Sequence, residues 1–195
     1  IEKITVEQLF NALESSSFSI DEQPYASLFK IYNHEFLSVS IAKGLIDTSS
    51  LSIAGDGMPV VTSARERKHR ICKCSENGIT SCGCGRYFSQ PDCDIGYDSS
   101  RDCFYHGYDL YMLVAADSES DLPIFPLLNP ASKHDSHGFL ETYFRFQSFL
   151  PEFHVRKWLL DSAHDAMPYY LYCRENGIQP FIDLNEKRGI SMKYK

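Results

Sequence analysis

The stretch LSIAGDGMPVV, residues 51–61, is the part of the sequence on which our fold prediction rests. A short apolar run rises from Leu51 and reaches Asp56, which stands between two glycines. Short apolar runs bounded by turn residues are typical of buried strands. We therefore expect a strand that delivers Asp56 at or near its end. An aspartate in that place is either a candidate for chemistry or an ordinary turn residue.

Downstream of this stretch, strand and helix patterns alternate. Period-two alternation and short apolar runs predict strands over 108–114, 122–128, 155–160 and 181–184. One helix is expected between a cap at Asp135 or Ser136 and Pro151, and another between Pro168 and Gly177. Together with the first strand, the order is that of an α/β domain with a mixed sheet.

Upstream, residues 1–50 are predicted to form a helical N-terminal segment. A short helix is expected over 6–13, followed by an amphipathic helix that stops near Gly44. The apolar face of that second helix is predicted from three- and four-residue spacing; its members are Tyr25, Leu28, Phe29, Tyr32, Phe36 and Val39. We assign residues 51–195 to the core domain.

Residues 63–104 differ in composition and are expected to be an insertion with little core of its own. Basic residues come first and could follow a phosphate backbone, although a charge run is usually a solvated face; they are Arg65, Arg67, Lys68, Arg70 and Lys73. Two Cys-x-Cys pairs come next, Cys72 with Cys74 and Cys82 with Cys84.

Short-spaced thiolates suit Zn²⁺, which takes four tetrahedral ligands in structural sites. We expect the two Cys-x-Cys pairs to provide those ligands. Three other residues could replace one of them, namely His69, Cys93 and Cys103. The alternative is a set of free thiols in a loop.

Composition sets broad limits on the function. The 195 residues carry a net charge of −7, and 43% of them are hydrophobic, which excludes a disordered chain. The acidic balance argues weakly against a stand-alone nucleic-acid binder. The longest apolar run, 110–116, is far shorter than the ~20 residues that a membrane span needs, so no membrane partner is expected.

The cysteines of the chain suggest a cellular compartment, and its first residue suggests a fragment. Seven cysteines without a secretory leader fit a reducing compartment better than a disulfide framework. The chain begins at Ile1 rather than at Met, which predicts a fragment of a longer protein.

The sequence L-D-S-A-H-D, residues 160–165, supplies the second candidate carboxylate. Asp161 follows a predicted strand, and the carboxyl ends of strands form sites in open α/β sheets. Asp56 and Asp161 could therefore meet and bind Mg²⁺, which prefers carboxylate oxygens. Asp165 is either a helix cap or shares a face with Asp161. His164 is expected to be a hydrogen-bonded surface residue rather than a ligand or a base.

Several of these motifs occur in the order found in a known family. Beside the residues above, they include Tyr97-Asp98-Ser99, Tyr105-His106-Gly107-Tyr108 and His134-Asp135-Ser136. The chain resembles the DDE-type transposases of bacterial insertion sequences over roughly residues 20 to 190. More narrowly, it resembles a subgroup with paired Cys-x-Cys motifs between the first two core strands.

This resemblance implies a ribonuclease-H-like core with a mixed five-stranded sheet flanked by helices. It implies a bacterial cytoplasmic enzyme that cleaves and transfers DNA strands at transposon ends with two Mg²⁺ or Mn²⁺ ions. By resemblance, Asp56 and Asp161 are metal ligands and Asp165 lies just behind them. DNA ends, target DNA and a second copy of the full-length protein are the implied partners.

One feature departs from the family pattern. The family places a glutamate on a helix well beyond the fifth strand, and Glu186 follows that strand too closely to match. We therefore expect the third acidic ligand to be missing and the isolated chain to bind Mn²⁺ weakly and cleave DNA poorly. Two alternatives remain: a zinc-stabilised, non-catalytic module that binds DNA or protein, and a different metal-dependent nuclease on the same fold.

Overall fold

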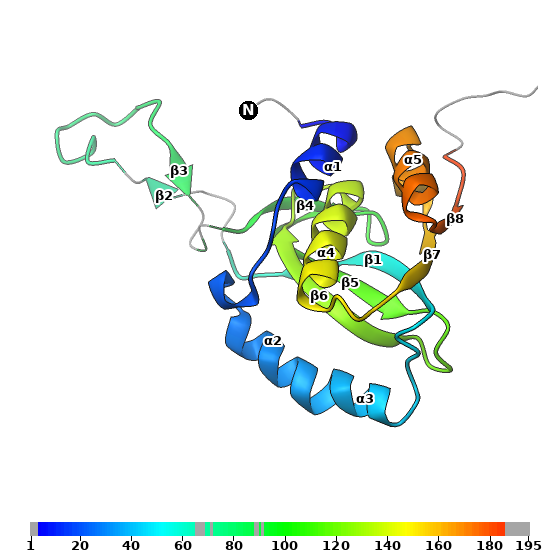
Figure 1. Cartoon of the computed structure of the whole chain (residues 1–195). Coiled ribbons are helices and arrows are strands. Elements are labelled where there is room, and N and C mark those ends of the chain that lie inside the picture. Colours follow the sequence, from blue (N-terminus) through cyan, green and yellow to red (C-terminus); the bar gives the residue numbers. More distant parts are fainter. Residues whose placement is uncertain (1–3, 65–68, 71, 88–89, 91, 186–195) are drawn as a thin grey trace, which may run out of the picture. The chain divides into compact units, whose positions relative to one another are not determined.

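The structure, a computed structural model, describes residues 4–64, 69–70, 72–87, 90 and 92–185 (Figure 1). The chain forms two compact units. Unit 1 comprises residues 1–57, 111–127 and 134–195, and unit 2 comprises residues 58–110 and 128–133. No helix in the described part of the chain has both the length and the apolar character needed to cross a membrane.

Unit 1 is built on a mixed sheet. Its strands belong to β1 (Leu51–Val61), β5 (Cys103–Ala115), β6 (Leu122–Pro130), β7 (Val155–Leu160) and β8 (Gln179–Ile182). The order is β6-β5-β1-β7-β8, because β5 pairs with both β6 and β1. β1 runs parallel to β7, and β7 runs parallel to β8. β5 is antiparallel to β1, since the backbone N–H of Ala116 donates to the carbonyl of Ser52 and Tyr111 lies beside Gly55.

The topology of this sheet agrees with the predicted fold class. Two hairpin-connected strands follow β1 on one side, and the chain then crosses through helices to the parallel strands β7 and β8 on the other. A mixed sheet flanked by helices is compatible with the ribonuclease-H-like fold that the sequence resemblance implies. The predicted strands over 108–114, 122–128 and 155–160 are confirmed, and the last strand lies at 179–182, two residues earlier than expected.

Unit 2 contains a strand that the sequence did not predict. β4 (Asp94–Asp98) pairs antiparallel with the first residues of β5, and together with five other strands it makes a six-stranded sheet. Aspartate and glycine are poor strand formers, so the pattern of residues 94–98 does not indicate a strand. A second, two-stranded sheet joins β2 (His69–Arg70) to β3 (Arg86–Tyr87). The main sheet therefore has six strands rather than the expected five, because the expected insertion over 63–104 contributes one.

Helices cover the sheet of unit 1. They are α1 (Val6–Glu14), η1 (Ile20–Glu22), α2 (Ala26–Tyr32), η2 (Asn33–Leu37), α3 (Ser38–Ala42), α4 (Asp135–Phe149), η3 (Ser162–His164) and α5 (Met167–Asn176). Thr5 and Gln8 form a capping box at the start of α1. Gly177 ends α5 with a positive φ of 66°, which glycine adopts without steric cost. α1 packs against α4 and α5 (Figure 1).

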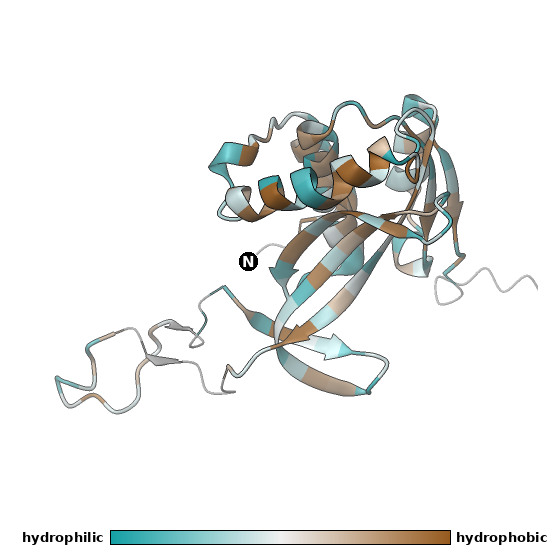
Figure 2. Cartoon of the chain, turned by 90° about the horizontal axis from the view of Figure 1, so that it is seen from below, coloured by the Kyte–Doolittle hydropathy of each residue, from teal (hydrophilic) through white to brown (hydrophobic). Residues whose placement is uncertain are grey.

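The amphipathic face predicted for residues 25–39 is only partly correct. Phe29 and Leu37 are buried, whereas Leu28, Phe36 and Val39 are exposed. Residues 33–37 form a π-helical turn, which adds one residue to the helical repeat. The inward position therefore moves from Phe36 to Leu37, and Leu28, Phe36 and Val39 remain exposed. Apolar and polar residues alternate along α2 and α3 (Figure 2).

An aromatic cluster forms the centre of the core of unit 1. The ring of Phe139 on α4 lies 4.9 Å from Trp158 on β7 and 5.9 Å from Tyr169 on α5, measured between centroids. Trp158 also stacks on Tyr172 at 5.4 Å. Phe139, Trp158 and Tyr169 have no exposed surface. Such ring pairs add roughly 0.5–1.5 kcal/mol each beyond the area they bury, so this cluster fixes α4 and α5 on the sheet.

We predict that Phe139→Ala lowers the free energy of unfolding by about 3–5 kcal/mol, because it removes a fully buried ring and leaves a cavity. Urea unfolding followed by tryptophan fluorescence measures this, since Trp158 is the only tryptophan in the chain and lies in the same cluster. Phe36→Ala is the matched control. Its ring is 62% exposed, and we expect a loss below about 1 kcal/mol. Equal losses in the two variants would contradict the packing described here.

Candidate functional site

The pairing of β1 with β7 brings Asp56 and Asp161 to the same level of the sheet. The register joins Ile53 to Trp158 and Ala54 to Leu159, and Asp56 and Asp161 each come two residues after this last pair. Neighbouring strands lie about 4.8 Å apart, and side chains at the same level of parallel strands point to the same face. Asp161 directly follows β7, as predicted. Asp56 lies in the middle of β1 rather than at its end.

The two carboxylates are held on one oxygen each. Oδ1 of Asp56 accepts the backbone N–H of Gly57 at 2.8 Å. Oδ1 of Asp161 caps η3 by accepting the N–H of Ala163 at 3.2 Å, and it also bonds Nδ1 of His164 at 2.6 Å. No described residue donates a hydrogen bond to Oδ2 of either aspartate. Both side chains are solvent-accessible, so each offers one carboxylate oxygen to a hard cation.

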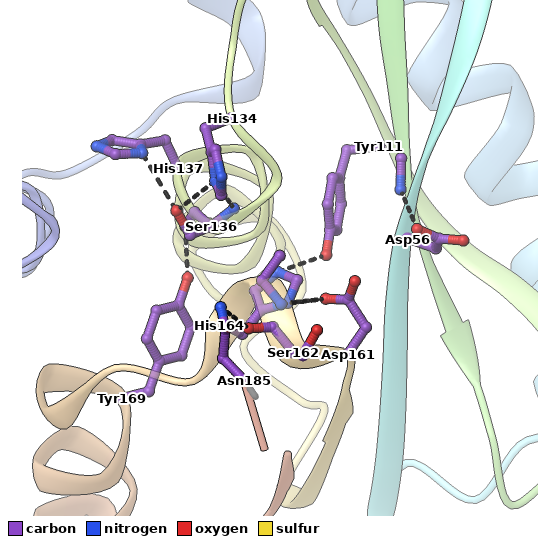
Figure 3. Close-up of polar contacts among 12 residues, drawn as sticks. Asp56, Tyr111, His134, Ser136, His137, Asp161, Ser162, His164, Tyr169 and Asn185 are labelled. Atoms are coloured by element: carbon purple, nitrogen blue, oxygen red, sulfur yellow. Dashed lines mark hydrogen bonds and ion pairs between the residues drawn. The ribbon is translucent and has the colours of Figure 1, made fainter. Parts of the chain in front are cut away.

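His164 is a buried residue of the site, so the expectation of a surface histidine is wrong. Its side chain is 1% exposed. Nδ1 faces Asp161, and Nε2 lies 3.1 Å from the hydroxyl of Tyr111 on β5 (Figure 3). The ring of His164 also packs edge-on against Phe139 and Tyr169. The contact between His164 and Tyr111 could not be predicted from the sequence, because Tyr111 lies on a different strand and has the pattern of an ordinary core residue.

Asp135 is a third carboxylate near the pair. The sequence indicated it only as a possible helix cap and as part of the motif His134-Asp135-Ser136. His134 is the N-cap of α4, and Asp135 stands in the first turn. Burial raises the pKa of Asp135, while His134 and His164 lower it and the charges of Asp161 and Asp56 raise it further. Burial raises the pKa of Tyr111, and the charges of these three aspartates raise it further. The available sequence signal was an acidic residue at the start of the helix that follows β6.

Asp165 supports the neighbouring loop rather than capping α5. Its carboxylate accepts the hydroxyl of Tyr170 at 3.0 Å and the backbone N–H of Asn185 at 2.8 Å. The N-cap of α5 is Ala166, which makes no side-chain cap. Asp165 therefore ties the segment after β8 to the residues that follow Asp161. A pocket of about 470 Å³ lies along this edge of the sheet and is lined by Leu159, Leu160, Asp161, Phe181, Ile182 and Asp183.

The four cysteines of the Cys-x-Cys pairs converge in unit 2. Their Sγ atoms all lie within 4.8 Å of one another. Cys72 and Cys82 are 3.5 Å apart between sulfurs, and Cys74 and Cys84 are 3.7 Å apart. Four clustered thiols of this kind could bind a metal ion. Cys93 and Cys103 lie outside this group.

Proton sharing within the cluster favours one thiolate. The backbone N–H of Cys74 lowers the pKa of the Cys72 thiol to about 7, with help from the thiol of Cys82. Hydrogen bonds to Cys72 and Cys84 raise the pKa of Cys74 to about 12. The neighbouring thiols thus stabilise a thiolate at Cys72 and disfavour a second thiolate at Cys74. A bound cation would replace the protons and allow further thiols to ionise.

The structure describes little of the basic run. Arg65, Arg67 and Lys68 lie outside the described residues, and only the backbone of Arg70 is described. Lys73 is exposed. A contact of these residues with DNA stays a prediction, as does the role of Glu186, which also lies outside the described residues.

No protein-family model matches the chain, and no curated protein sequence matches it. A search of solved structures gives the Drosophila P element transposase strand transfer complex. The identity is 11% and the TM-score is 0.25, over 96% of this chain and 43% of that one. The chain thus spans less than half the length of that transposase chain.

We predict that Asp135→Asn raises the free energy of unfolding at pH 7. The pKa of Asp135 is raised in the folded state, so the folded protein binds its proton more tightly than the unfolded chain does. The ionised form therefore destabilises the fold above the folded-state pKa, and this cost disappears as the pH falls below the unfolded value. Urea unfolding at pH 7 and at pH 4 measures the difference between the variant and the wild type.

Glu119→Gln, which removes one charge from an exposed turn, is the control for the Asp135→Asn experiment. We expect Asp135→Asn to gain stability at pH 7 and to lose most of that gain at pH 4. A gain of the same size at both pH values, or the same gain in Glu119→Gln, would refute the electrostatic explanation.

Proposed function

We propose that this chain is the catalytic core of an enzyme that cleaves and transfers DNA strands with bound divalent cations, as DDE transposases do. The observation that supports this most directly is the register of β1 and β7, which brings Asp56 and Asp161 to one level on neighbouring strands. The mixed sheet is compatible with the ribonuclease-H-like fold of that family. The order of motifs in the sequence adds the resemblance to transposases.

The donor atoms fit Mg²⁺ or Mn²⁺, because both candidate ligands are carboxylates with an accessible oxygen that no described residue occupies. Such ions lower the pKa of a coordinated water and stabilise the leaving oxygen of a phosphodiester. Asp56 and Asp161 would hold the ions at the sheet. His164 and the N–H of Ala163 keep Oδ1 of Asp161 turned inward, so Oδ2 is the oxygen that faces a ligand.

The remaining parts of the proposal come from the resemblance. The resemblance places a third acidic ligand on a helix beyond the last strand of the core. The basic run from Arg65 to Lys73 would contact the DNA backbone, and a homodimer would hold the two transposon ends. Asp165 would support the site from behind through the segment after β8.

We predict that the wild-type chain binds Mn²⁺ weakly and that Asp56→Asn and Asp161→Asn each reduce that affinity at least about tenfold. Titration followed by Mn²⁺ electron paramagnetic resonance measures the free ion directly. Glu152→Gln, an exposed acidic residue outside the site, is the control and should bind like the wild type. If all three variants bind Mn²⁺ like the wild type, these aspartates do not form a metal site.

A strand-transfer assay separates a transposase from another nuclease on the same fold. The assay supplies pre-cut DNA ends and a target plasmid and measures joined products. Hydrolysis without joining, in a chain that includes the third ligand, would favour the nuclease. Robust nicking by the 195 residues alone would show that they supply every ligand that cleavage needs.

A second candidate function, a zinc-stabilised module that binds DNA or protein, is favoured by the cysteine cluster of unit 2. Zn–S bonds of about 2.3 Å in a tetrahedron imply sulfur separations near 3.8 Å. The separations of 3.5 and 3.7 Å between paired sulfurs agree with that geometry. We propose that Cys72, Cys74, Cys82 and Cys84 bind a structural Zn²⁺. This site is compatible with catalysis by unit 1.

We predict about one zinc ion per chain in protein purified without added metal. The double variant Cys82→Ser/Cys84→Ser should lose the ion, and Cys103→Ser, an exposed thiol outside the cluster, should retain it. Elemental analysis by mass spectrometry gives the stoichiometry, and limited proteolysis of residues 72–84 before and after chelation tests the structural role. A chain without zinc would leave these cysteines as loop thiols.

A further inference from the structure

We propose that Tyr111 and His164 form a hydrogen-bonded relay that positions Asp161 for metal binding. The inference rests on the proposed function, because it assigns a role within the same site. Neither residue carries a function in the resemblance described above. The chain of contacts runs from Tyr111 on β5 through His164 in η3 to Asp161 after β7 (Figure 3).

Both ring nitrogens of His164 make a hydrogen bond, and each partner determines whether that nitrogen donates or accepts. Nδ1 lies 2.6 Å from Oδ1 of Asp161, and Nε2 lies 3.1 Å from the hydroxyl of Tyr111. An ionised carboxylate can only accept, so Nδ1 carries the hydrogen. In the neutral ring Nε2 then accepts, and the Tyr111 hydroxyl donates to it. The relay therefore fixes a single tautomer of His164.

The surroundings of Tyr111 support its role as the donor. Its side chain is fully buried on β5. Burial, together with nearby negative charges, raises the pKa of Tyr111 well above its usual value. The phenol consequently stays protonated at neutral pH, and its hydrogen remains available to His164.

Packing leaves the relay little freedom to rearrange. The ring of His164 lies edge-on to Phe139 at 5.5 Å and to Tyr169 at 5.6 Å. Tyr111 in turn requires a glycine on β1, because a Cβ at Gly55 would lie 2.9 Å from the Tyr111 ring. Gly55 immediately precedes Asp56. One buried ring thus shapes the strand that carries Asp56 and, through His164, orients Asp161.

Asp161 needs such support because its side chain is 57% exposed. An exposed carboxylate samples several rotamers, and ordering it on metal binding costs side-chain entropy. If one rotamer is already fixed, metal binding no longer carries this entropy cost. Residues that hydrogen-bond to a metal ligand in this way typically change metal affinity or activity by 10–100-fold when they are mutated. A role in core packing alone predicts no such effect.

The test compares His164→Asn with His164→Gln in the 195-residue chain. The amide nitrogen of Asn can occupy the position of Nδ1 and keep the donor to Asp161, whereas the amide of Gln reaches the position of Nε2. We expect Mn²⁺ affinity to fall about tenfold or more in His164→Gln and to stay within about threefold of the wild type in His164→Asn. His154→Gln makes the same change at an exposed position and should bind like the wild type.

Nitrogen NMR of the wild-type chain gives a readout that does not depend on the variants folding. We expect His164 to show a protonated Nδ1 and an unprotonated Nε2 without any metal, because Nδ1 donates to Asp161. Tyr111→Phe should keep this tautomer but shift the Nε2 resonance, because the variant removes the donor to Nε2. The opposite tautomer, or equal Mn²⁺ affinities in both His164 variants, would overturn the relay. Failure of the proposed function is distinct, because Asp161→Asn would then leave Mn²⁺ binding unchanged.

Discussion

The parallel pairing of β1 with β7 is the constraint on which the rest of the structure depends. Parallel strands cannot be joined by a tight turn, so the chain between them must form a crossover. Here that crossover is a hairpin, β5 and β6, followed by α4. Once β1 and β7 share a register, Asp56 and Asp161 come to one level of the sheet. The candidate site is therefore a direct consequence of strand pairing.

The core of unit 1 is aromatic where it meets this site. Phe139 contacts Trp158 on one side and His164 on another, so the same ring supports the sheet and the histidine behind Asp161. A buried imidazole is costly unless its nitrogens are paired. Tyr111 and Asp161 satisfy both nitrogens, which explains how a polar residue is accommodated among rings. Stability and preorganisation of the site thus depend on the same contacts.

The two candidate metal centres differ in chemistry and lie in different units. Carboxylate oxygens in unit 1 suit a hard, exchangeable cation, which is what phosphoryl transfer requires. Thiolates in unit 2 suit Zn²⁺, which contributes to folding rather than to catalysis. Residues 72–84 contain no helix or strand, so four thiols around one ion would supply the order that a small apolar core cannot. The two centres can therefore be tested independently of each other.

The sequence by itself determined the main elements, because periodicity, caps and breakers are local: α1, α5 with Gly177, and most strands of the sheet follow from it. It also indicated Asp56, Asp161 and the cysteine pairs, whose short spacing is visible along the chain. Only the tertiary structure decided the register that joins the two aspartates, the π-helical turn that buries Leu37, and the pairing of β4. It alone brought Tyr111 to His164, because contacts between residues far apart in sequence leave no local periodicity to read.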